Sequence, residues 1–99
     1  MTFEDHVRRA LDSLPPDLTR GLENVAVVVE DENRDDPDLL GLFEEEPYMP
    51  AKISIYRLPL EESFRDPREL EREIRITVLH ELAHYFGIDE ERLEELGYD

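Results

Sequence analysis

The stretch between Asp66 and Gly87 constrains the fold more than any other part of the chain. Its twenty residues, PRELEREIRITVLHELAHYF, hold no glycine and no proline after the first position. Asp66 can cap the start of a helix here, and Gly87 can end it. On a helical wheel at about 100° per residue, one arc of roughly 200° is apolar: Ile74, Ile76, Val78, Leu79, Leu82, Ala83, Tyr85 and Phe86. A helix this apolar must be the central one, covered on most sides.

The first residues of the chain predict a second helix. Its apolar residues recur at helical spacing and form one stripe: Phe3, Val7, Ala10, Leu11 and Leu14. Thr2 can cap its start together with Asp5, and Pro15-Pro16 would end it. His6 lies one position off the stripe, so we expect it at the surface.

Two segments predict β-strands. Residues 24–32, NVAVVVEDE, form a short β-branched apolar run of the kind found in buried strands. Residues 51–60, AKISIYRLPL, alternate between apolar and polar, which is typical of a strand with one buried face. Pro59 would stop pairing soon after, which suits an edge strand.

The remaining elements complete a small α+β domain. An acidic loop between the two strands encloses a short apolar piece, Leu39 to Phe43, around Gly41, so the sheet has two or three strands. A last short helix is expected from about Glu90 to Leu96. With 99 residues, the chain has room for one core, and we expect a single domain over residues 1–99.

Composition narrows the possible functions. The chain has no cysteine, so any metal must be held by His, Asp or Glu. Its 11 basic and 27 acidic residues give a net charge of −16, which disfavours nucleic acid and anionic membranes as partners. No signal peptide and no apolar run of roughly 18 residues is present, so we expect a soluble cytoplasmic protein. The oligomeric state is left open.

His80 and His84 lie in the only polar strip of the long helix. Residues four apart share one face, so two imidazole nitrogens can bind one zinc ion at about 2.0–2.1 Å. Glu81 lies too far round to be a natural third ligand, but it can contact a zinc-bound water, whose pKa falls to about 7. This is the His-Glu-x-x-His arrangement of zinc-dependent hydrolases. The alternative is an exposed or satisfied pair of helix histidines.

The segment TVLHELAHYFGIDEERLEELGY resembles the active-site segment of small bacterial metallopeptidase-like proteins with a minimal zincin fold. LLGLFEE and KISIYRLPLE match the rest of that family's pattern, so the resemblance covers most of the chain. It implies an N-terminal helix, a small sheet, a long metal-binding helix and a short C-terminal helix. It also implies zinc ligands at His80, His84 and Glu90, with Glu81 as the catalytic residue.

Asp89 competes with Glu90 for the place of the third ligand. Asp89 directly precedes EERLEEL, so it is well placed to cap the last helix. Glu90 is longer and stands at the family's third-ligand position, three residues past Gly87. The alternative role for Glu90 is that of a favourable acidic residue in the first turn of a helix.

The resemblance also implies a substrate site, because an extended substrate commonly pairs with a strand above the metal helix of zincins. The counterpart here is Lys52 to Arg57, so five residues are expected to bind substrate: Lys52, Ile53, Ser54, Ile55 and Tyr56. The alternative is a purely structural edge strand. Tyr48, Tyr85 and Tyr98 are candidates to stabilise the transition state, although the wheel places Tyr85 in the core.

These features predict a zinc-dependent metallopeptidase that hydrolyses small or unfolded peptides. Only nine residues follow Glu90, so we expect neither a methionine turn nor a lower subdomain. The missing cleft floor favours an alternative, a catalytically inactive zincin-like module that binds metal or a peptide strand. Glu81 favours the enzyme, because structural zinc does not need a free carboxylate there. A third hypothesis is an acidic interaction domain without metal.

Overall fold

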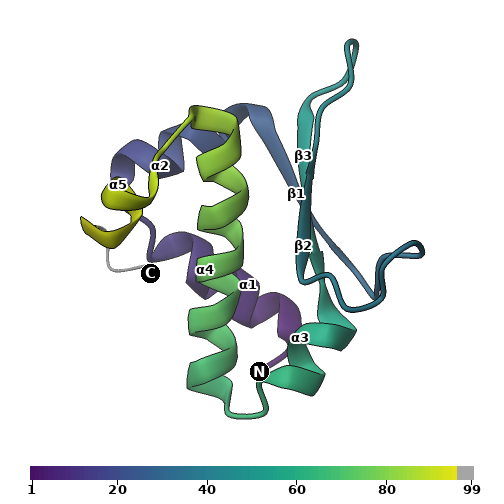
Figure 1. Ribbon diagram of the computed structural model, residues 1–99. Coiled ribbons are helices and arrows are strands. Elements are labelled where there is room, and N and C mark those ends of the chain that lie inside the picture. Colours follow the sequence, from purple (N-terminus) through teal and green to yellow (C-terminus); the bar gives the residue numbers. More distant parts are fainter. Residues whose placement is uncertain (96–99) are drawn as a thin grey trace.

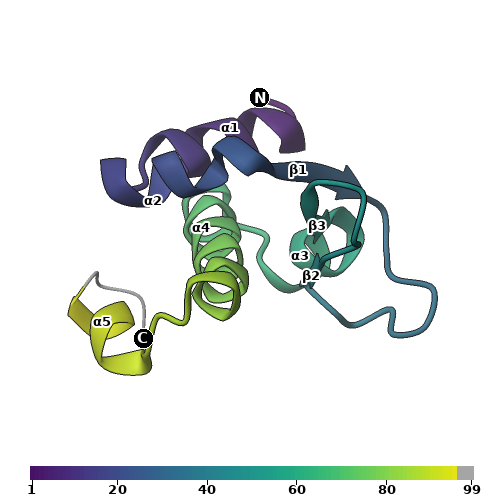
Figure 2. The same cartoon turned by 90° about the horizontal axis from the view of Figure 1, so that it is seen from above.

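The computed structural model describes residues 1–95, without the side chain of Glu90. Figure 1 shows the elements in chain order: α1 (Phe3–Asp12), α2 (Pro16–Gly21), the short 3-10 helix η1 (Leu22–Asn24), β1 (Val25–Glu30), β2 (Gly41–Glu44), β3 (Ala51–Tyr56), α3 (Arg57–Ser63), α4 (Pro67–Phe86) and α5 (Glu90–Glu95). Figure 2 looks along α4, with α1 and α2 on one side of it and the sheet on another. The α+β prediction is confirmed, with α4 at the centre.

The sheet has the strand order β1-β3-β2. β3 pairs in parallel with β1, where Val27 lies opposite Ile53, and antiparallel with β2, where Phe43 lies opposite Ile53. The prediction of an edge strand at residues 51–56 is therefore wrong, because both edges of β3 are paired. Pro59 lies in α3, beyond the end of the strand, so its missing N–H removes nothing from the ladder.

Both faces of β3 are buried, which the alternating pattern did not predict. Ile53 and Ile55 face the core, and Ser54 and Tyr56 on the other face are only 0% and 2% exposed. The loop after β1 covers part of that face, where Asn33 Nδ2 donates to the Tyr56 hydroxyl at 3.0 Å. The predicted strand after Asn24 does form, as β1, but it lies at an edge of the sheet and is only partly buried.

α4 has the predicted bounds and the predicted caps. The Asp66 carboxylate accepts from the backbone N–H of Arg68 at 2.8 Å, and Gly87 ends the helix at φ 64°. Its core face is fully or nearly fully buried: Leu70, Ile74, Val78, Leu79, Leu82 and Ala83. Tyr85 and Phe86 depart from the wheel, because the last turn leaves them 38% and 44% exposed. The prediction that Tyr85 lies in the core is wrong.

α1 begins as predicted, with Thr2 and Asp5 bonding to each other's backbone N–H groups at 3.2 and 2.8 Å. The bond from the Thr2 backbone lowers the pKa of the Asp5 carboxyl. α1 ends at Asp12, and Pro15-Pro16 opens α2 with Pro16 in its first turn, where no N–H is needed. The sequence did not predict α2 or α3.

His6 is buried, at 9% exposure, so the prediction of a surface histidine is wrong. α1 packs against α4, and the His6 ring nitrogen Nδ1 lies 3.9 Å from Glu71 Oε2 of that helix. The covered face of α1 is therefore wider than its apolar stripe.

Within residues 1–95, no helix combines the length and the apolar character that a membrane span requires.

Candidate metal centre

His80 and His84 both lie exposed on α4. A helix rises about 1.5 Å per residue and turns once in about 3.6 residues, so their side chains leave the same face about one turn apart. Neither imidazole forms a hydrogen bond or ion pair with another residue of the described chain. Both are therefore available to a ligand from solution.

Glu81 lies on the side of α4 that faces the edge strand β2, and it is half-buried. A Cβ atom built on Gly41 of β2 would lie 3.8 Å from Glu81 Cγ. Because each residue advances about 100° around the helix, His80 and His84 lie to one side of Glu81, and that side faces solvent. Glu81 thus leaves α4 between the histidine face and the edge strand β2.

Gly41 makes this close approach possible, and the sequence analysis did not assign it a role. A Cβ atom at this position would lie 2.5 Å from Thr77 Cγ2, closer than van der Waals contact allows, and at a tight 3.2 Å from the Ser54 carbonyl oxygen. An isolated glycine inside a strand often marks such a contact. The signal was present in LLGLF, as a glycine within an apolar run.

The substrate role predicted for Lys52, Ile53, Ser54, Ile55 and Tyr56 depended on an open strand edge. β3 has no open edge, since β1 and β2 pair with it on either side over these residues. Within the described residues, β2 pairs only with β3, so its other edge is unpaired. The unpaired strand edge beside α4 is therefore that of β2, whereas the resemblance implied an open edge at residues 52–57.

The chain turns back after α4. The backbone N–H of Ile88 donates to the Ala83 carbonyl at 3.0 Å, which closes the turn at Gly87. The backbone N–H of Arg92 donates to Asp89 Oδ1 at 2.9 Å, so the prediction that Asp89 caps the last helix is confirmed. Leu93 is buried and anchors α5 to the core. The Glu90 side chain lies outside the described part, and its ligand role stays a prediction.

The three candidate tyrosines for transition-state stabilisation differ in position. Tyr48 is 98% exposed in the connection between β2 and β3. Tyr85 packs against Phe43 of β2, with 5.2 Å between ring centroids. Tyr98 lies outside the described residues.

Zinc suits the donors at this face. Two exposed imidazoles one turn apart, with carboxylates and no thiolate in the chain, match the nitrogen and oxygen ligands that zinc accepts. Among the described side chains, no group of three His, Asp or Glu is close enough together to hold a metal ion. Glu90, whose side chain lies outside that set, stays the predicted third ligand.

The comparison with protein families agrees with this arrangement. A family model described as zincin-like metallopeptidase matches residues 22–98. The chain belongs to this family. The match includes β2, β3 and the histidine face of α4, while α1 and α2 precede it. Zincin-like metallopeptidases generally bind zinc, so the family supports zinc as the metal. A comparison with curated proteins finds no match.

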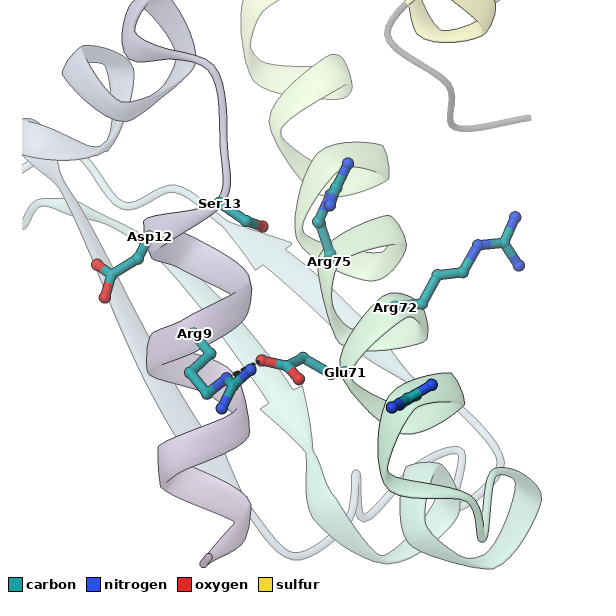
Figure 3. Close-up of a pocket in the computed structure, with 7 residues that line it drawn as sticks. Arg9, Asp12, Ser13, Glu71, Arg72 and Arg75 are labelled. Carbon is teal, nitrogen blue, oxygen red and sulfur yellow. Dashed lines mark hydrogen bonds and ion pairs between the residues drawn. The ribbon is translucent and has the colours of Figure 1, made fainter.

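A separate hollow of about 540 Å³ lies between α1 and α4 (Figure 3). At about 100° per residue, its wall residue Glu71 leaves α4 roughly half a turn round from His80. Its lining is charged except for Ser13: Arg9, Asp12, Arg68, Glu71, Arg72 and Arg75. Across it, Arg9 Nε donates to Glu71 Oε1 at 2.8 Å. This ion pair links the two helices, and the hollow is not part of the candidate metal centre.

Proposed function

We propose that the chain is a zinc-dependent peptidase in which His80, His84 and Glu90 hold the metal and Glu81 is the general base. One observation carries the proposal: two exposed histidines without partners in the described chain lie one turn apart on α4, with Glu81 between them and the unpaired edge of β2. A bound zinc ion would polarise a water molecule and the peptide carbonyl.

Glu81 would accept the proton of the attacking water and then donate it to the leaving amine. A carboxylate is suited to this work when it lies within hydrogen-bond reach of the reacting water. Its half-buried place beside Gly41 restricts the directions in which the side chain can extend. The restriction favours a carboxylate held toward the histidine face.

The substrate would be an extended peptide that pairs with the unpaired edge of β2. Backbone hydrogen bonds to a sheet edge give affinity without regard to sequence, and only an extended chain can make them. β2 is four residues long, so it can align only a short segment. This favours small peptides or unfolded chains over folded proteins.

The Glu81→Gln variant tests the catalytic part of the proposal. The amide cannot accept the water's proton at neutral pH, so peptide cleavage should be lost while elemental analysis finds the same zinc content as in the parent. Glu73→Gln is a matched control, since Glu73 is a half-buried acid two turns earlier on the same helix. If the parent cleaves nothing in a broad peptide library, catalysis is excluded and the binding module remains.

The third ligand needs its own pair of variants. Glu90→Ala should weaken zinc affinity sharply. Asp89→Ala should leave the affinity unchanged and cost about 0.5–2 kcal/mol of stability, because it removes the cap on Arg92. Loss of affinity with Asp89→Ala alone would move the ligand to Asp89.

A further inference from the structure

Three aromatic rings form a continuous row beside the candidate metal centre. Phe43 of β2 contacts Tyr85, and Tyr85 contacts Phe86 at 4.8 Å between centroids in an edge-on arrangement. Tyr85 and Phe86 directly follow His84 in the chain, and both are more than one-third exposed. Charged residues make up 38% of the chain, so contacts between exposed aromatic side chains are unusual on its surface.

A hollow of about 500 Å³ adjoins Tyr85, at the end of the sheet where β2 leads into β3. Five of its wall residues are apolar or aromatic: Pro47, Met49, Pro50, Ala51 and Tyr85. Asn24, Glu45 and Glu46 complete the lining. Met49 is 65% exposed, although its side chain is large and apolar. The wall therefore offers apolar area that no described part of the chain covers.

The direction of β2 relates this hollow to the metal centre. β2 begins at Gly41, beside Thr77 and Glu81, and reaches Tyr85 at Phe43. Beyond Glu44, the chain continues into the residues that line the hollow. A peptide laid along β2 past Glu81 would therefore extend toward Tyr85 and the hollow.

We propose that Tyr85, Met49 and the two prolines form a subsite for a bulky apolar side chain of the peptide. The inference rests on the proposed function, because it needs a peptide on the edge of β2. Antiparallel pairing is slightly more stable per residue than parallel pairing. An antiparallel peptide runs from the Glu44 end of β2 toward Gly41, so the subsite takes a side chain on the amino-terminal side of the cleaved bond. The substrates are then unfolded segments that carry an apolar residue on the amino-terminal side of the cleaved bond.

Peptide binding to the zinc-loaded Glu81→Gln protein tests the subsite separately from catalysis. The probes are two fluorescein-labelled decapeptides of serine and threonine that differ at one position, phenylalanine in one and alanine in the other. The phenylalanine peptide should bind about fivefold more tightly or better, given the area that a phenyl ring buries. Equal affinities, or no binding of either peptide, would overturn the subsite.

Variants locate the preference on the surface. Met49→Ser should reduce the preference for phenylalanine, and its exposed position makes loss of folding no concern. Tyr85→Ser should reduce it further, with circular dichroism to confirm that the helix persists. Leu58→Ser is the matched control, since Leu58 is a 40% exposed apolar residue on α3. An equal loss of preference with Leu58→Ser would contradict the assignment.

Cleavage by the parent protein gives an independent outcome. Bonds cut in a mixed peptide library should carry apolar residues more often on their amino-terminal side. If the Glu81→Gln protein prefers phenylalanine but the parent cuts nothing, the subsite stands and the catalytic proposal fails. If the parent cuts peptides and apolar residues are enriched only on the carboxyl-terminal side, the subsite fails and catalysis stands.

Discussion

α4 carries polar residues on two faces, where the wheel predicted a single polar strip, and the two faces differ in how they relate to the rest of the chain. On the face toward α1, Glu71 accepts a hydrogen bond from Arg9 at 2.8 Å and lies 3.9 Å from the His6 ring. On the other face, His80 and His84 lie exposed and bind no described residue. The first face meets another helix, and the second meets solvent beside a strand edge. Polar residues on one helix can thus serve packing on one side and remain available to a ligand on the other.

The difference matters because exposed histidines contribute little to folding. The Arg9–Glu71 pair joins residues that are 62 positions apart, so it supports the packing of α1 on α4. His80 and His84 lie on the central helix of the fold, but they are exposed and have no hydrogen bond or ion pair with a described residue. The family match covers both histidines, and the role proposed for them is zinc binding.

The largest effect is expected where β2 meets the histidine side of α4. Gly41→Ala should cost about 1–3 kcal/mol, because the new methyl group would lie 2.5 Å from Thr77 Cγ2. Denaturant unfolding measures the loss. Adding Thr77→Ser removes that methyl carbon and should recover part of the stability. Failure of Thr77→Ser to recover any would show that the close contact with α4 is not the cause.

A smaller effect is expected for the ion pair on the opposite face. Arg9 is 60% exposed at its side chain and Glu71 is 23% exposed, so solvent screens their attraction. A double-mutant cycle with Arg9→Gln and Glu71→Gln should give a coupling of about 0.2–1 kcal/mol. A coupling energy of zero between Arg9 and Glu71 would remove the contrast, since neither the α1-facing side nor the histidine side of α4 would then contribute to stability.

The smallest effect is expected for the histidines in metal-free protein. His80→Ala and His84→Ala, measured in the presence of a chelator, should each change stability by less than about 0.5 kcal/mol. Thermal melting followed by circular dichroism is sufficient. A loss larger than that of Arg9→Gln would mean that the histidines do hold the fold, which would reverse the comparison.

The features that the sequence predicted correctly depend on neighbours in the chain. Asp66, Gly87 and Asp89 act on backbone groups within a few residues, and each acts as the pattern indicated. The histidine face follows from the same local geometry, since four residues make about one turn.

The features that were missed depend on contacts between distant residues. The strand order was not predictable, because nothing in residues 51–56 indicates that both β1 and β2 pair with them. Tyr56 and Ser54 look like solvent-facing residues until the loop after β1 and the flanking strands cover them. His6 is buried because α1 packs on α4, where Glu71 lies beside it.

Zinc binding to the histidine variants tests the central claim most directly. Protein purified without a chelator or a histidine tag should contain one zinc ion per chain by elemental analysis. His80→Ala and His84→Ala should each contain none, while His6→Asn, which changes the remaining histidine of the chain, should keep its zinc. Full zinc content in the His84→Ala protein would contradict the account and place the metal elsewhere.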